Sequence, residues 1–138
     1  MAKKVLTGHK GFIGSHYYNY VKDTYDVYPY DQKDGDDKNL RYPSVTNNMP
    51  DCNTVVHLAA TNGTRLFYQN PTDVCINNTL PTINLIERYR NTDTKFVFAS
   101  TCEIFNSTID NGYYHVPTDE AVPVMYNDIT NPRWSYSI

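Results

Sequence analysis

The sequence predicts an α/β fold, in which a parallel sheet carries helices on both of its faces. Several observations predict it. Short apolar stretches typical of buried strands alternate with stretches of helical periodicity. A glycine-rich turn follows the first strand, and small or polar residues follow two later ones. Strands that alternate with helices in this way form parallel sheets through right-handed crossovers.

The N-terminal half is expected to hold two strands, a helix and a long loop. A strand over 3–7 leads into a helix over 11–23, and a second strand covers 25–31. Residues 32–50 contain glycine, aspartate, asparagine and proline with little periodicity, so a long loop is expected there, with or without a short residual strand. The side chains expected to face inward from the helix are Phe12, Ile13, Tyr17 and Val21.

The C-terminal half continues the alternation. A buried strand is expected over 53–58, a helix over 71–90 and a strand over 95–99, before a loop-rich tail to residue 138. Pro81 should kink the helix or split it. No boundary is expected inside the chain, so residues 1–138 are taken as one domain. The apolar residues that recur at helical spacing are Ile76, Leu80, Ile83 and Ile86.

Composition excludes several classes of function. The chain has 138 residues, is 40% hydrophobic and has a formal net charge of -3, which offers no electrostatic footprint for nucleic acid. It holds no run long enough to span a membrane and no signal peptide, so no membrane partner and a cytoplasmic location are expected. The cysteines, Cys52, Cys75 and Cys102, are widely spaced, and the histidines have no partners at ligand spacing. No metal site is expected.

The glycine-rich turn predicts a dinucleotide site. Gly8, Gly11 and Gly14 follow a strand and open a helix. Gly8 would allow a tight turn, Gly11 would let bare backbone approach a pyrophosphate, and Gly14 would let the helix pack closely. The helix N-terminus would then present unpaired N–H groups to the phosphates. The alternative is a glycine-rich turn that binds nothing.

Asp31 ends the second strand. Its separation in sequence from Gly14 is close to that expected for the carboxylate that binds the adenosine ribose. Such a carboxylate repels a 2′-phosphate, which favours NAD over NADP, although Lys33 lies close enough to weaken the preference. The alternative is a solvated loop acid, because a polar run follows that includes Asp34, Asp36 and Asp37.

Two later strands end in residues that suit a ligand site, since ligands bind beyond the carboxyl ends of parallel strands. Residues 58–63 are mostly small, so that a cofactor could lie against the backbone. Residues 100–103 place a hydroxyl, a thiol and a carboxylate together. Hydroxyls at a strand end also serve to cap the next turn, but this alternative does not require Glu103.

Together these motifs resemble a known family. Residues 7–14, 55–60 and 98–105, with Asn78 and the stretch 84–87, occur in the order and spacing of an extended short-chain dehydrogenase/reductase. The chain is similar to the N-terminal part of the NAD-dependent nucleotide-sugar epimerase/dehydratase family. The resemblance implies a Rossmann-type domain that binds NAD, incomplete at its C-terminal side, and a smaller domain for the nucleotide sugar that is absent here.

The resemblance also assigns a role to each motif residue. In the cofactor site it implies that the glycines wrap the pyrophosphate, that Asp31 holds the ribose and that Asn78 braces the active site. The residues whose backbone N–H groups would bind phosphate are Phe12 and Ile13, and those that would flank the cofactor are Leu58, Ala59 and Ala60.

The implied reaction is oxidation of a sugar C4 hydroxyl by transient hydride transfer to bound NAD. Tyr136 matches the catalytic tyrosine, Thr101 matches the serine or threonine beside it, and Glu103 resembles the glutamate of sugar 4,6-dehydratases and UDP-glucuronate decarboxylases. This glutamate favours a lyase branch over a simple isomerase. Cys102 stands where those branches have aspartate or serine, which weakens the dehydratase assignment.

The end of the chain leaves two hypotheses. The family's lysine would fall one helical turn past Tyr136, beyond Ile138, so the chain is expected to be inactive alone. It is either the N-terminal portion of such an enzyme or a non-catalytic module that binds NAD or a protein. Self-association is expected in both cases, because an incomplete sheet exposes an edge and an apolar face.

Overall fold

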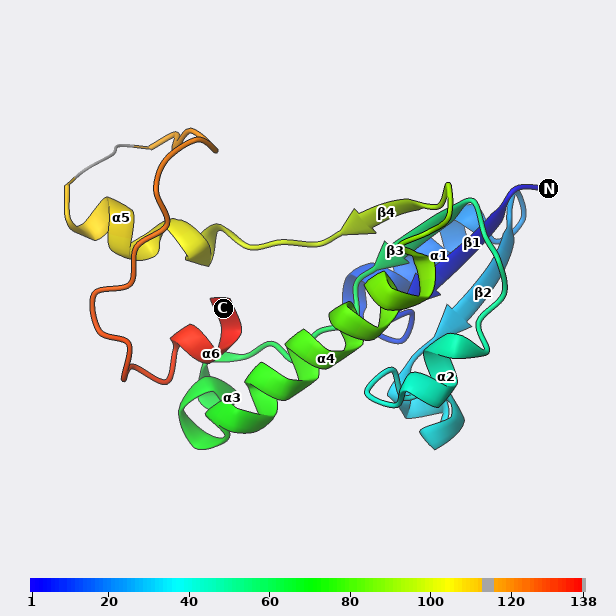
Figure 1. The fold of residues 1–138 in the computed structure, drawn as a ribbon, viewed down its shortest axis with the longest axis horizontal. Coiled ribbons are helices and arrows are strands. Elements are labelled where there is room, and N and C mark those ends of the chain that lie inside the picture. Colours follow the sequence, from blue (N-terminus) through cyan, green and yellow to red (C-terminus); the bar gives the residue numbers. More distant parts are fainter. Residues whose placement is uncertain (113–115, 138) are drawn as a thin grey trace. The chain divides into compact units, whose positions relative to one another are not determined.

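The computed structural model describes residues 1–112 and 116–137, which form two compact units. The first unit comprises residues 1–61 and 76–99, and the second comprises 62–75 and 100–138. Both are drawn in Figure 1. The division does not test the expectation of a single domain, which stays a prediction. His115 lies outside the described residues.

The first unit is built on a four-stranded parallel sheet in the order β2-β1-β3-β4 (Figure 1). Apolar residues of the two central strands, Val5, Leu6 and Val55, are fully buried. The sheet confirms the predicted fold class. Its strands are β1 (Lys3–Thr7), β2 (Asp26–Tyr30), β3 (Thr54–His57) and β4 (Lys95–Phe98).

The helices that join the strands lie on opposite faces of the sheet. Helix α1 (Phe12–Val21) carries the chain from β1 to the neighbouring β2, and α4 (Pro71–Tyr89) carries it from β3 in the other direction to β4. Right-handed crossovers in opposite directions require opposite faces. On the α4 face, Val5 and Val55 pack with Leu85 and other buried residues into the core.

The inward face expected for α1 is wrong at two positions. Phe12 is 84% exposed and Ile13 is 66% exposed, whereas Gly14 and Val21 are buried. Residues seven positions apart lie two turns apart on the same side of a helix, so Gly14 and Val21 define the packed face. Phe12 and Ile13 belong to the first turn and point away from that face.

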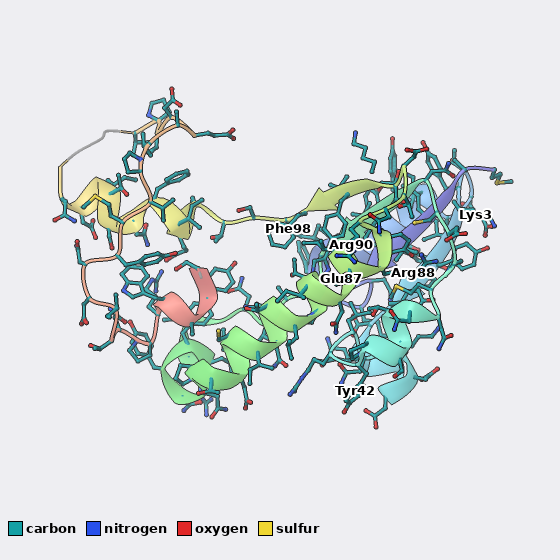
Figure 2. The ribbon with its side chains drawn as sticks, in the orientation of Figure 1. Lys3, Tyr42, Glu87, Arg88, Arg90 and Phe98 are labelled. Atoms are coloured by element: carbon teal, nitrogen blue, oxygen red, sulfur yellow. The ribbon has the colours of Figure 1, made fainter. Side chains whose placement is uncertain are left out.

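Helix α4 is not split by Pro81. It also does not pack through most of the apolar residues at helical spacing from which the helix was predicted. It is continuous, and its buried residues include Val74, Pro81 and Leu85. A proline inside a helix costs about 3 kcal/mol, which close packing can offset. Near its C-terminus, Arg88 donates to the carbonyl oxygen of Met49 over 3.2 and 2.8 Å, and it lies at the end of α4 as Figure 2 shows. The exposed apolar residues of the helix are Leu80, Ile83 and Ile86.

The stretch 32–50 contains no strand. It forms the 3-10 turns η1 (Gln32–Asp34) and η2 (Asp36–Lys38), followed by the short helix α2 (Pro43–Asn47). Asn84 of α4 donates to the carbonyl oxygens of Leu40 over 2.9 Å and Arg41 over 3.2 Å. The loop is therefore fixed by a side chain distant in the sequence.

The C-terminal part of the second unit is loop-rich, as the sequence predicts, and its described residues hold only short helices near its two ends. Trp134 is 7% exposed and donates from Nε1 to the carbonyl oxygen of Asp128 over 2.6 Å. Among the described residues no helix is long and apolar enough to cross a membrane. The elements of this unit are α3 (Thr64–Gln69), η3 (Cys102–Phe105), α5 (Asn106–Asp110), α6 (Trp134–Ser137) and the beginning of α4.

Candidate cofactor site

The glycine turn is shaped by backbone contacts that leave no room for side chains. Gly8 has a φ of 76°, and its N–H donates to the carbonyl oxygen of Tyr30 over 2.8 Å. A Cβ on Gly8 would lie 2.7 Å from the nitrogen of Ala59. A Cβ on Gly14 would overlap the carbonyl oxygen of Gly8 itself. The bare backbone therefore lets β1, α1 and the loop after β3 meet in one place.

Asp31 connects this turn to the end of β2. It is 8% exposed, and its Oδ2 accepts the N–H of Lys10 over 3.0 Å while Oδ1 accepts the N–H of Lys33 over 3.0 Å. Each carboxylate oxygen accepts more than one hydrogen bond, so Asp31 keeps lone pairs for a hydroxyl group. The carboxylate is thus built into the turn and does not belong to the solvated run that follows it.

The last residue of η1 also contacts the glycine turn. Asp34 forms an ion pair with Lys10, and its carboxylate lies 3.3 Å from Nε2 of His9. The hydrogen bond from Lys10 is the largest effect that lowers the pKa of Asp34. These contacts fix the loop after β2 against the loop after β1.

The loop after β3 is held at both of its ends. The N–H of Ala59 donates to Oγ1 of Thr7 over 3.2 Å. Asn78 accepts the N–H of Thr61 over 2.7 Å and donates back to its carbonyl oxygen over 3.1 Å. This closed pair of bonds is the bracing contact of Asn78, and it acts on the loop backbone.

A cleft opens where these loops meet. Six of the predicted cofactor residues line it: Gly8, Gly11, Asp31, Leu58, Ala59 and Ala60. Phe12, Ile13, Gly14 and Asn78 are not among the lining residues. Lys33 and Thr61, which the sequence also places near the cofactor, line it as well. The lining residues that the sequence did not indicate are Gln32, Asn39, Leu40, Arg41, Asn77 and Pro81.

One feature of the sequence could have indicated some of these cleft-lining residues. Leu40 is an isolated apolar residue in a polar stretch, and it is 5% exposed in the structure. A lone leucine in such a stretch indicates a point where the loop packs onto the core. Its neighbours Asn39 and Arg41 are thereby placed at the cleft.

His57, at the end of β3, is a buried histidine beside the cleft. It is 2% exposed, and its ring contacts Oγ1 of Thr7 over 2.6 Å and Oγ1 of Thr82 over 3.1 Å. Burial lowers the pKa of His57 from 6.5 to about 4, because the charged ring would lose its hydration. The imidazole is therefore neutral at pH 7.

This burial predicts a pH dependence of stability. Between pH 6.5 and 4 the unfolded chain binds a proton at His57 that the folded chain does not bind. The free energy of unfolding should therefore fall by about 3 kcal/mol as the pH drops through this window, and His57→Asn should lack that component. Urea unfolding of both proteins from pH 4 to 7.5 measures the difference. Parallel pH profiles would contradict it.

The second unit holds the expected catalytic residues. Oγ1 of Thr101 accepts the N–H of Glu103 over 3.2 Å, which caps η3. The ring of Tyr136, in α6, stacks on Phe67 with centroids 4.8 Å apart. The catalytic roles of these residues stay predictions.

Glu103 is bound by an arginine that the sequence analysis did not pair with it. Arg133 donates from Nε to Oε2 over 2.8 Å and from Nη2 to Oε1 over 2.5 Å. Asn106 donates to Oε2 as well, over 2.7 Å. The hydrogen bond to Glu103 raises the pKa of Arg133. Such a two-point ion pair gives the carboxylate a fixed orientation.

Comparison with known proteins gives a consistent result. The sequence model described as "NAD dependent epimerase/dehydratase family" matches residues 5–138. No curated protein matches the chain significantly.

Solved structures share the fold. The UDP-Glc/GlcNAc 4-epimerase of Campylobacter jejuni is 24% identical with a TM-score of 0.75, over 99% of this chain and 46% of the epimerase. TunA, an NAD-dependent NDP-hexosamine 5,6-dehydratase, is 20% identical with a TM-score of 0.75, over 99% and 46%. RMD of Pseudomonas aeruginosa, complexed with NADPH, is 20% identical with a TM-score of 0.72, over 99% and 45%. The chain thus spans less than half the length of each of these proteins.

Proposed function

Because the chain belongs to the NAD dependent epimerase/dehydratase family, we propose that its cleft binds NAD and that the protein acts on a nucleotide sugar. The observation that carries the proposal is the glycine turn. Its backbone is so close-packed that a Cβ at Gly8 or Gly14 would meet other backbone atoms, and the turn borders a cleft that contains Asp31. These residues fit a dinucleotide, since a pyrophosphate requires bare backbone and a ribose requires a hydrogen-bond acceptor.

The finer assignments of the proposal follow from particular residues. Asp31 would accept the ribose hydroxyls, which favours NAD over NADP because a buried carboxylate repels a 2′-phosphate. Lys33 and Arg41, which also line the cleft, act in the opposite sense. When bound, the nicotinamide supplies hydride acceptance.

The reaction proposed for the sugar uses residues of the second unit. In this proposal Tyr136 would take the proton of the sugar C4 hydroxyl onto the oxygen of its phenolate form, and Thr101 would hydrogen-bond the same hydroxyl. Glu103 supports a dehydratase or decarboxylase branch. UDP- or dTDP-linked hexoses are the proposed substrate class. In support, one similar structure is named for a UDP sugar and another for an NDP-hexosamine.

Isothermal titration calorimetry with NADH and with NADPH measures the Kd of each nucleotide and so tests the cofactor assignment. Saturable binding of NADH that is tighter than binding of NADPH is the expected result. Tighter binding of NADPH would overturn the preference for NAD. A folded chain that binds neither nucleotide would overturn the whole proposal.

A non-catalytic module is the second candidate, and the ion pair between Glu103 and Arg133 favours it. A carboxylate held by an arginine and by Asn106 is fixed as a structural acceptor. This candidate predicts NADH binding without conversion of UDP-glucose, UDP-glucuronate or dTDP-glucose, even when the family's sugar-binding domain is supplied. The enzyme candidate also predicts no conversion by this chain alone, but it predicts conversion once that domain is supplied. Conversion of any of these sugars would exclude the non-catalytic module.

We also propose that the protein self-associates. Leu80, Ile83 and Ile86 are 39%, 48% and 50% exposed on one side of α4. An apolar stripe on a helix is usually covered by packing, and a second copy would cover this one. Light scattering over a wide concentration range tests the proposal, and a constant monomer mass would contradict it.

A further inference from the structure

His57 belongs to a chain of hydrogen bonds that runs through the interior of the first unit. The chain joins β1, β3 and α4 through the side chains of Thr7, His57 and Thr82. His57 does not line the cleft. Thr7, however, contacts the loop that does, and Thr82 binds the backbone of Asn78, which contacts the same loop.

The direction of every bond in the chain follows from the contacts. The hydroxyl of Thr82 donates its proton to the carbonyl oxygen of Asn78 over 2.9 Å. Its oxygen must therefore accept from Nε2–H of His57. In a neutral ring Nδ1 is then bare, so it accepts the hydroxyl proton of Thr7. The oxygen of Thr7 in turn accepts the N–H of Ala59.

A neutral histidine in one tautomer satisfies this chain completely. A charged ring would place Nδ1–H against Oγ1 of Thr7, and the hydroxyl proton of Thr7 would then lose Nδ1 as its acceptor. The lowered pKa of His57 agrees with the neutral form. Each hydroxyl then donates once and accepts from its neighbour in the chain, which is the arrangement that makes a buried polar network stable.

Both ends of the chain hold the same short loop. At one end the N–H of Ala59 is bound by Thr7. At the other end Thr82 binds the backbone of Asn78, whose side chain closes the bonds to Thr61. Ala59 is also the residue closest to the space above Gly8, where a Cβ would lie 2.7 Å from its nitrogen.

We propose that Thr7, His57 and Thr82 are positioning residues of the cofactor site, which fix the loop 59–61 at the right distance from the glycine turn. This inference rests on the proposed NAD-binding function. It assigns His57 a role for which a purely apolar residue would not serve, because only a side chain with a donor at one end and an acceptor at the other completes the chain.

Isosteric variants test the proposal. Thr7→Val and Thr82→Val remove one hydroxyl each with little change in volume, and neither residue lines the cleft. Each is expected to raise the Kd for NADH about fivefold, and Thr7→Ser should restore it. Val55→Ala is the matched control, because it weakens the same buried core without touching the chain. It should lower Tm but leave the Kd within about twofold of the native value.

A second readout is independent of the cofactor. The nitrogen-15 shifts of His57 should report a protonated Nε2 and a bare Nδ1. Exchange of the Ala59 amide proton should become faster in Thr82→Val, although that residue does not contact Ala59, and remain slow in Val55→Ala measured at matched stability.

The outcomes separate this inference from the proposed function. A native chain that binds NADH, with an unchanged Kd in both threonine variants, would overturn the positioning role alone. A native chain that binds no NADH would overturn the proposed function and this role together. The opposite tautomer at His57 would overturn the chain of bonds itself.

Discussion

Gly14→Ala is expected to abolish NADH binding and to lower the free energy of unfolding by about 3 kcal/mol. A Cβ at this position would overlap the carbonyl oxygen of Gly8 and lie 2.8 Å from its carbonyl carbon and 2.9 Å from Cα of His9. These are backbone atoms of the turn itself, which cannot rotate away as a flexible side chain would. The turn must open, and the N–H groups at the start of α1 then lose their arrangement. Calorimetric titration and urea unfolding measure the two effects.

Other glycines separate crowding from backbone strain. Gly112 has a φ of 70°, close to the 76° of Gly8, but no atom of the described residues beyond its own neighbours lies within 4 Å of its Cβ position. Gly112→Ala should therefore cost only the strain of a left-handed residue, about 1–2 kcal/mol, and leave NADH binding unchanged. Gly8→Ala combines this strain with crowding against Ala59 and should therefore cost more than Gly112→Ala. A Gly14→Ala protein that binds NADH within twofold of the native Kd would show that the turn does not hold the cofactor.

The positions of the strands could be predicted because their signals are local. Apolar stretches such as Val5–Leu6 and Val55–Val56 are followed by small or polar residues, and both features lie within a few positions. The parallel arrangement then follows from the alternation with helices. The glycine turn could be found for the same reason, because the glycines that it requires lie within a few positions of one another.

The faces of the helices could not be predicted in the same way. Exposure of Phe12 at 84% and Ile83 at 48% depends on which side of the helix meets the sheet. Spacing indicates an apolar stripe but not which stripe is covered. Pro81 does not split α4 for a related reason. Its side chain is buried in the continuous helix, and packing overrides its low helix propensity.

Hydrogen-bond and ion-pair partners that are far apart in the sequence could not be predicted either. Arg133 binds Glu103, which lies 30 positions earlier in the chain, and Asn84 fixes the backbone of Leu40, which lies 44 positions earlier. Neither pairing has a local signature. The residues of the cleft at 39–41 were missed because this loop has no periodicity of its own and is placed by such long-range bonds.

Asp31→Asn is expected to weaken NADH binding about tenfold and to leave the Kd for NADPH unchanged or lower. The substitution removes the charge and replaces one oxygen acceptor by a donor. A ribose hydroxyl thereby loses a charge-assisted bond, while a 2′-phosphate loses a repulsive neighbour. Calorimetric titration of both nucleotides gives the two Kd values, and the preference for NADH should fall by about tenfold.

The ratio of the two Kd values decides between two roles of Asp31. Its carboxylate also accepts the N–H groups of Lys10 and Lys33, so the variant must loosen the turn to some extent. A looser turn weakens the binding of NADH and of NADPH equally, because the two nucleotides differ only at the ribose 2′ position. This effect therefore cancels in the ratio of the two Kd values. Asp34→Asn removes an equal charge from the same loop and an ion pair with Lys10, so it should change both Kd values without changing their ratio by more than about twofold. Equal weakening of both nucleotides by Asp31→Asn would mean that the carboxylate only holds the turn, and the preference for NAD would then have to come from another residue of the cleft.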